Sequence, residues 1–233
     1  MTTIKVMSAG AVQAMVTALG GEFERESGHK ISTTFNTAGA LREGFLAGDI
    51  PDVLILPASS IEVLEKAGHF VPGSRIDLGR TVTGVVVRAG SAVPDISTPE
   101  AFKRALLSAK SVSYTDPKAG GSSGNFFVGL LQRLGIADEI GRKAVMGKRG
   151  HDVAQLVADG RAELGTTFIS EILTVSGAQV AGPLPGDLHN ANTYTAAIPV
   201  RASEPEAARA LVAKLTDPAS RQRWTKAGLE PAF

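Results

Sequence analysis

Cysteine is absent from this chain of 233 residues. Its absence excludes a disulfide framework and thiolate metal sites, and it removes the usual indicator of redox compartment. The four histidines are dispersed without the spacing of a metal site, so we expect no metal ion and no cofactor. No pair of carboxylates stands out for acid–base catalysis either.

The chain also lacks an excess of charge of one sign. Its 24 Lys and Arg residues almost balance 23 Asp and Glu residues, for a net charge of +1. A nucleic-acid groove normally needs a clear basic excess or a dense basic stripe, so we expect no nucleic-acid partner.

Long apolar runs are missing too, and none approaches the length that spans a bilayer. The N-terminal stretch "MTTIKVMSAG" has strand character and lacks a charged leader with a long apolar core. We therefore expect either a cytoplasmic protein, if Met1 is the native start, or a periplasmic protein whose leader has been removed.

What the chain does contain is an alternation of strand and helix patterns. Hydrophobic residues make up 43% and charged residues 20%, which is typical of a packed globule. Strand patterns at 3–8, 30–35 and 52–57 are each followed by a helical pattern. This rhythm indicates an α/β protein with a parallel sheet covered by helices. We expect two lobes, residues 1–80 with 195–233 and residues 81–194.

Three strand-to-helix turns share a composition of small and hydroxyl-bearing residues. Such turns lie at the carboxyl ends of strands, where open α/β sheets bind ligands. Backbone N–H groups at the start of a helix also favour an anion. The residues of the three turns are Ser8, Ala9 and Gly10, then Thr37 and Ala38, and then Gly121, Ser122 and Ser123.

The third turn, in "DPKAGGSSGNFF", admits other interpretations. It contains neither of the two glycine-rich nucleotide-binding motifs. "GGSSG" fits the nucleophile elbow of hydrolases loosely, but four residues separate it from the preceding strand. A plain helix cap, with Ser122 or Ser123 as the capping residue, remains the alternative to an anion site.

Basic side chains lie close to the same turns in the sequence. Arg42 falls one turn into the second helix, and Lys148, Arg149 and His151 precede a later helix. A solvated helix charge is the default interpretation of each. The alternative is that they contact the same ligand as the turns.

These features together resemble the periplasmic molybdate-binding proteins of ABC transporters, within the type II solute-binding fold. The resemblance covers nearly the whole chain. It is carried by "VMSAGAVQAM", "TTFNTAGAL", "SYTDPKAGGSSG", "DVAQLVADGRAELGTTFISE" and the terminal "EPEAARALVAKLTDPASRQRWTKAGLEP". The resemblance implies a two-lobed type II fold with a ligand cleft between the lobes, and an ABC permease as partner if the protein is exported.

The ligand shell that the resemblance implies differs from the family pattern at several positions. Gly10 stands where the family has its first hydroxyl, and Thr37 matches the second. The turn of Ser122 and Ser123 carries about one extra residue. Val153 matches a backbone N–H contact, and Phe168 replaces a tyrosine and has no hydroxyl to donate.

Two hydroxyl donors are thus lost, while basic residues are gained. A guanidinium fork matches a carboxylate better than a compact oxyanion. We therefore expect a substrate-binding protein for a small organic di- or tricarboxylate rather than for molybdate.

An isomerase of unsaturated carboxylic acids, such as aconitate isomerase, is the alternative on the same fold. His151 would be its catalytic base and Arg42 and Arg149 its carboxylate clamps. A weaker third hypothesis is an intracellular sensor that binds the anion and signals to a partner.

Overall fold

The computed structural model describes all residues from 1 to 233, and the chain divides into two compact units. Unit 1 consists of Met1–Arg80 and Asn192–Phe233, and unit 2 of Thr81–Ala191. The chain leaves unit 1 within strand β4 (Ile76–Arg88) and returns near the start of strand β9 (Ala191–Ala197). No helix combines the length and apolar composition that crossing a membrane requires.

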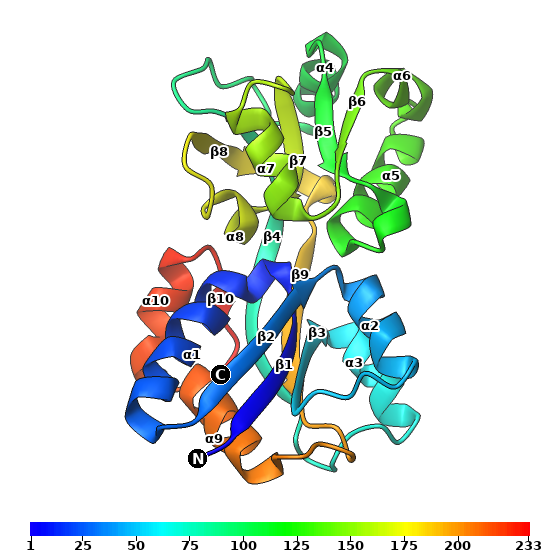
Figure 1. The fold of residues 1–233 in the computed structure, drawn as a ribbon. Helices are drawn as coiled ribbons and strands as arrows, with labels where there is room; N and C mark the ends of the chain where they lie inside the picture. Colours follow the sequence, from blue (N-terminus) through cyan, green and yellow to red (C-terminus); the bar gives the residue numbers. More distant parts are fainter. The chain divides into compact units, whose positions relative to one another are not determined.

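Unit 1 is built on a sheet in the order β2-β1-β3-β9-β4, with β10 paired to β4. Strand β1 runs parallel to β2 and β3, whereas β9 runs antiparallel to β3. Helices α2 and α3 cover one face of this sheet, and α1, α9 and α10 lie on the other side (Figure 1). The elements are β1 (Thr3–Ala9), α1 (Gln13–Ser27), β2 (Lys30–Asn36), α2 (Ala38–Leu46), β3 (Val53–Pro57), α3 (Ala58–Lys66), α9 (Pro205–Leu215), α10 (Arg221–Lys226) and β10 (Glu230–Pro231).

Unit 2 has the strand order β4-β7-β5-β6, with β8 also paired to β4. Strand β5 runs parallel to β6 and β7, and β7 runs antiparallel to β4. The elements are α4 (Pro99–Ser108), β5 (Val112–Thr115), α5 (Ser122–Arg133), α6 (Ala137–Arg142), β6 (Ala144–Gly147), α7 (Gly150–Ala158), β7 (Leu164–Phe168), α8 (Ile169–Ile172) and β8 (Ala178–Pro183).

Each unit has its own apolar core, formed where helices cover the sheet. In unit 1, Phe45 of α2 and Leu64 of α3 pack against Leu54 of β3, whose strand is buried at all five positions. In unit 2, Phe102 of α4 and Phe127 of α5 pack together on one face. The opposite face of unit 2 is covered by α7, through a separate apolar cluster that consists of Val86, Val153, Ala154, Val157, Ala162, Ile172 and Val175. Burial of both faces explains why β3 is an entirely apolar strand.

The sheets are mixed rather than wholly parallel, because β4 and β9 run against their neighbours. The strand–helix pattern of the first 66 residues correctly predicts parallel pairing there, but it carries no information on strands that return from a distant part of the chain. Strands β6 and β8 escape prediction from the sequence. Strand β6 has four residues, and β8 contains Gly182 and Pro183, which weaken a strand pattern.

Candidate functional site

Two of the predicted turns lie together at one edge of the unit 1 sheet. Strand β1 ends at Ala9 and continues into a short 3-10 helix, Gly10–Val12, that leads into α1. Strand β2 ends at Asn36, and Thr37 is the N-cap of α2. Because Ala9 pairs with Asn36 in the parallel register, both turns begin at the same level of the sheet.

The hydroxyls of these turns are engaged with the backbone. Ser8 is completely buried, and its hydroxyl donates to the carbonyl of Ala9 at 3.2 Å. The Thr37 hydroxyl accepts a hydrogen bond from the Ala40 amide at 3.3 Å. The amides of Ala38 and Gly39 precede the first intrahelical bond of α2, as at every helix start, and they supply the donors of this turn.

Arg42 lies in the middle of α2 with an exposed side chain. No carboxylate lies within ion-pair distance of its guanidinium. Its charge is therefore available to an external anion.

Two further turns lie together in unit 2. Thr115 at the end of β5 pairs in register with Gly147 at the end of β6, and the Asp116 amide donates to the Gly147 carbonyl at 2.8 Å. Helices α5 and α7 begin after these strand ends, so their first turns belong to the same edge of the sheet.

The glycine-rich turn before α5 is shaped by close packing as well as by exposed amides. Gly121 is the N-cap and has no side-chain cap, so neither serine caps this helix. The Ser123 hydroxyl instead lies 3.3 Å from the Thr115 hydroxyl, in a buried position. A Cβ atom at Gly124 would lie 2.2 Å from the Thr115 carbonyl oxygen. The capping alternative for Ser122 and Ser123 is therefore wrong, and Gly124 is required by the approach of α5 to β5.

Arg149 and Asp152 organise the start of α7. The Arg149 amide donates to Asp152 Oδ2 at 3.0 Å, and the Arg149 guanidinium lies 3.4 Å from Asp152 Oδ1. The Val153 amide donates to the Arg149 carbonyl at 3.3 Å. Since that amide is already used within the helix, the preceding amides of Gly150 and His151 are the better donors to a ligand.

His151 is held by a chain of hydrogen bonds that fixes its tautomer. Its Nδ1 lies 3.0 Å from the Thr174 hydroxyl, which donates to the carbonyl of Glu171 at 2.7 Å. Because the Thr174 proton is used in that bond, Nδ1 must carry the proton that it donates to Thr174. In the neutral ring, the basic atom is then Nε2.

Glu171 belongs to the same region, and its significance cannot be read from the sequence. Its side chain is buried in α8, and Thr167 donates to Oε2 at 2.8 Å. Burial raises the pKa of Glu171 to about 7, against the opposing effects of the Thr167 hydroxyl, the Phe168 amide and the Arg149 charge. The sequence signal is a single acidic residue inside the apolar stretch "TTFISEILTV".

Phe168 is buried at the end of β7 and is the N-cap of α8. Its ring has no hydroxyl to donate, so only its backbone contributes polar contacts at this place.

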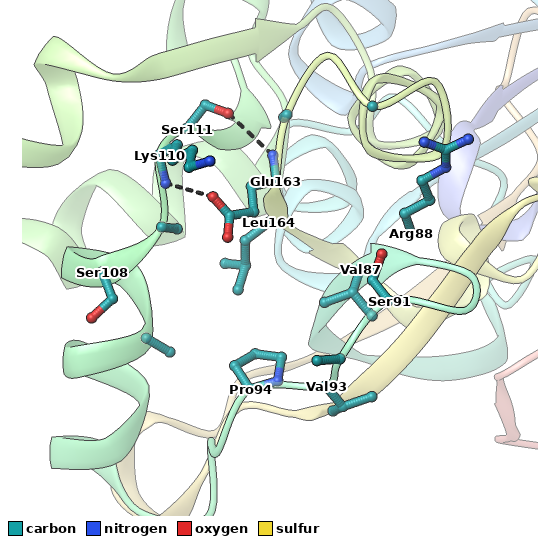
Figure 2. Close-up of a pocket in the computed structure, with 15 residues that line it drawn as sticks. Val87, Arg88, Ser91, Val93, Pro94, Ser108, Lys110, Ser111, Glu163 and Leu164 are labelled. Carbon is teal, nitrogen blue, oxygen red and sulfur yellow. Dashed lines mark hydrogen bonds between the residues drawn. The ribbon is translucent and has the colours of Figure 1, made fainter.

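A further pocket of unit 2 lies elsewhere. It has a volume of about 600 Å³ and is lined by Arg88, Lys110 and Glu163 among others. Figure 2 shows the Glu163 carboxylate pointing into it, bonded to the Lys110 amide at 2.7 Å. Ser111 and Leu164 lie where β5 and β7 begin, so this pocket opens at the sheet edge opposite the strand-to-helix turns. No group of three or more potential ligands is placed to hold a metal ion.

The two α/β units, with helix starts gathered at their sheet edges, define the class of two-lobed solute-binding proteins. The chain matches the family described as bacterial extracellular solute-binding protein over residues 4–230, and it belongs to this family. It has the type II periplasmic-binding-protein fold. The solved molybdate-binding protein of Azotobacter vinelandii superimposes with a TM-score of 0.79 at 19% identity, covering 99% of this chain and 100% of that one.

Two relatives are similar over most of the sequence. An aconitate isomerase from Pseudomonas sp is 29% identical over 235 residues, which cover 99% of this chain and 88% of the relative. The molybdate-binding protein ModA of Azotobacter vinelandii is 28% identical over 221 residues, covering 92% of this chain and 84% of the relative. The molybdate-binding resemblance of the sequence is thereby confirmed at the level of the family.

Proposed function

We propose that the protein binds a small organic di- or tricarboxylate, and that turns of both units contact the same anion. In unit 1 the donors are the turn of Ser8, Ala9 and Gly10 and the start of α2 at Thr37 and Ala38. In unit 2 they are the starts of α5 and α7. The family supports binding of a small solute, and we propose an ABC permease as the partner. Because the family is described as extracellular, we also propose a periplasmic location.

The observation that carries the choice of ligand is the unpaired guanidinium of Arg42 on the helix that begins at the amide-lined turn. Neutral N–H and O–H donors suffice for a compact dianion. A guanidinium provides a planar pair of donors that matches a carboxylate, and it adds a full positive charge. The Ser8 and Ser123 hydroxyls also favour a carboxylate over a compact oxyanion, because both already have hydrogen-bond partners within the protein.

Calorimetric titration with cis-aconitate, trans-aconitate, malonate, molybdate and sulfate tests this proposal. We expect one equivalent of a di- or tricarboxylate to bind, with weaker or no binding of molybdate and sulfate. Arg42→Ala should weaken that binding by about tenfold or more, as loss of a charge-assisted hydrogen bond implies. Arg209→Ala is the matched control, because Arg209 is an exposed helix arginine of the same unit that pairs with Glu206. Tight binding of molybdate alone would overturn the choice of ligand.

A second candidate is an isomerase of an unsaturated tricarboxylic acid. Two observations favour it: the similarity to an aconitate isomerase and the arrangement of His151, whose Nε2 is left as the basic atom. In such a reaction Nε2 would remove a proton from a carbon next to a carboxylate. Arg42 and Arg149 would stabilise the negative charge on that carboxylate, and the imidazolium would return the proton to another carbon.

Ultraviolet absorbance during incubation with cis- or trans-aconitate separates the two candidates. An isomerase converts either compound to the same equilibrium mixture, whereas a binding protein leaves both unchanged. His151→Asn is the informative variant, because the asparagine amide can still donate to Thr174 but offers no base. It should abolish conversion while it preserves binding. Conversion that persists in this variant would exclude His151 as the base.

A further inference from the structure

Glu171 is a buried acidic group for which anion binding alone has no use. It lies in α8, one turn after the end of β7, and only 7% of its surface is exposed. Its Oε2 accepts a hydrogen bond from Thr167 at 2.8 Å. A lone carboxylate buried at this cost needs either a compensating cation or a proton.

The carboxylate lies directly against the first residue of α7. A Cβ atom built on Gly150 would fall 1.8 Å from Glu171 Oε2 and 2.3 Å from Thr167 Oγ1. Only glycine fits there. The acidic group therefore lies beneath the same helix start whose Gly150 and His151 amides we assign to the ligand.

The charged groups around Glu171 do not neutralise it. Helix α8 packs against α7, β7 and β8, and it also contacts β4 at Thr81 and Gly84. The charged groups that act on the Glu171 carboxylate are Arg149 and Asp152, both at the start of α7. Arg149 attracts its negative charge, but Arg149 is itself paired with Asp152, which repels that charge. His151 reaches Glu171 only through Thr174 and its backbone carbonyl.

We propose that Glu171 couples anion binding at the start of α7 to the uptake of one proton. An ionised Glu171 places a negative charge beneath the amides that bind the anion, and a protonated Glu171 does not. The bound anion in turn favours the protonated form of Glu171. This inference rests on the proposed function, because it assumes that an anion binds at this turn.

The sign of the effect follows from the pKa of about 7 in the ligand-free protein. A bound anion raises this pKa further, so a proton is taken up on binding at and above neutral pH. Affinity should fall as the pH rises from 6 to 8, with a limiting slope of tenfold per pH unit for one linked proton. Glu171→Gln mimics the protonated form and should bind with little dependence on pH in this range.

Calorimetry at pH 7.5 in two buffers of different ionisation enthalpy counts the protons taken up. The probes are trans-aconitate, molybdate and sulfate; sulfate keeps the same charge from pH 6 to 8. We expect uptake of up to one proton by the unaltered protein and close to none by Glu171→Gln. Glu163→Gln is the control, since Glu163 lies at the opposite edge of the unit 2 sheet.

The outcomes separate this inference from the proposed function. Carboxylate binding without proton uptake overturns the role of Glu171 and leaves the proposed ligand intact. Binding of molybdate or sulfate alone, with proton uptake, overturns the proposed ligand and supports the role of Glu171. Binding of none of the anions overturns both. In the ligand-free protein, carbon-13 NMR of labelled glutamate should show Glu171 titrating near pH 7, and titration of Glu171 near the ordinary value of 4.5 would also overturn the inference.

Discussion

At the scale of the single residue, Glu171 makes stability depend on pH in an unusual direction. Its folded-state pKa of about 7 lies above the ordinary value of 4.5, so the folded protein binds a proton that the unfolded chain releases between these values. The contribution is fully favourable below about pH 4.5 and is lost as the pH rises through 7. The loss amounts to about 3 kcal/mol at most, from the size of the shift.

Glu171→Gln should remove this loss. We expect the free energy of unfolding of the variant, relative to the unaltered protein, to be higher at pH 8 than at pH 5 by up to about 3 kcal/mol. Urea unfolding at the two pH values measures the difference. Glu163→Gln should show no such change, and a Glu171→Gln variant that behaves like it would contradict the buried, protonated state.

Two glycines of α5 provide a second residue-scale test. Gly124→Ala places a Cβ atom 2.2 Å from the Thr115 carbonyl, and we expect it to destabilise the protein by about 2 kcal/mol or more through overpacking. Gly129→Ala on the same helix meets nothing within 4 Å and should stabilise by about 0.5–1 kcal/mol, from helix propensity. Thermal unfolding of both variants measures these two changes in stability. Equal effects would mean that the α5–β5 approach is looser than described.

At the scale of secondary-structure elements, Asp52 joins three of them. Its two carboxylate oxygens accept hydrogen bonds from the amides of Lys5 in β1 and Glu204 at the start of α9, each at 2.8 Å. Asp52 itself directly precedes β3. Asp52→Asn presents an NH2 group to one of these amides, so one bond is lost and a buried donor is left unsatisfied. We expect a loss of about 2–3 kcal/mol in the free energy of unfolding.

Asp49→Asn is the matched control for this change, because Asp49 is exposed in the same connection. Its stability should stay within about 0.5 kcal/mol of the unaltered protein. A similar stability for both variants in chemical unfolding would show that the Asp52 bonds add nothing to this junction.

The elements that the sequence predicts well are those whose signals are local. The buried strand "DVLILP" and the helix within "SSIEVLEKAG" are examples, since strand and helix periods are visible within ten residues. The position of the three turns follows from the same local patterns. The antiparallel placement of β9 beside β3 depends on residues more than a hundred positions apart, and no local pattern encodes it.

The same distinction between local and distant information holds for the candidate site. Small and hydroxyl-bearing turn residues can be recognised in the sequence, whereas their hydrogen-bond partners cannot. Three contacts in the site depend on packing and not on any local pattern. Ser123 faces Thr115, the Val153 amide is used within α7, and Glu171 lies under Gly150. Phe168 and Arg42 were identified from the resemblance and from charge, and their contact with a ligand remains a prediction.

At the scale of the whole molecule, binding by both units has a direct signature. Hydrogen exchange in the presence of saturating ligand should slow at the start of α2 in unit 1 and at the starts of α5 and α7 in unit 2. The reason is that amides without intrahelical partners become donors to the anion. Mass spectrometry of peptides from residues 36–46, 116–127 and 147–158 measures this. Protection confined to one unit would contradict a shared ligand.

The division of the chain also sets the order in which the protein can be completed during its synthesis. Unit 2 is one continuous segment, Thr81–Ala191, and all of it leaves the ribosome before the end of unit 1. The sheet of unit 1 is completed later, because β9 lies between β3 and β4 and is synthesised only with residues 191–197. Domains generally fold as units during translation. The nascent chain should therefore carry a finished second unit while the first, although begun earlier, still has a gap in the middle of its sheet.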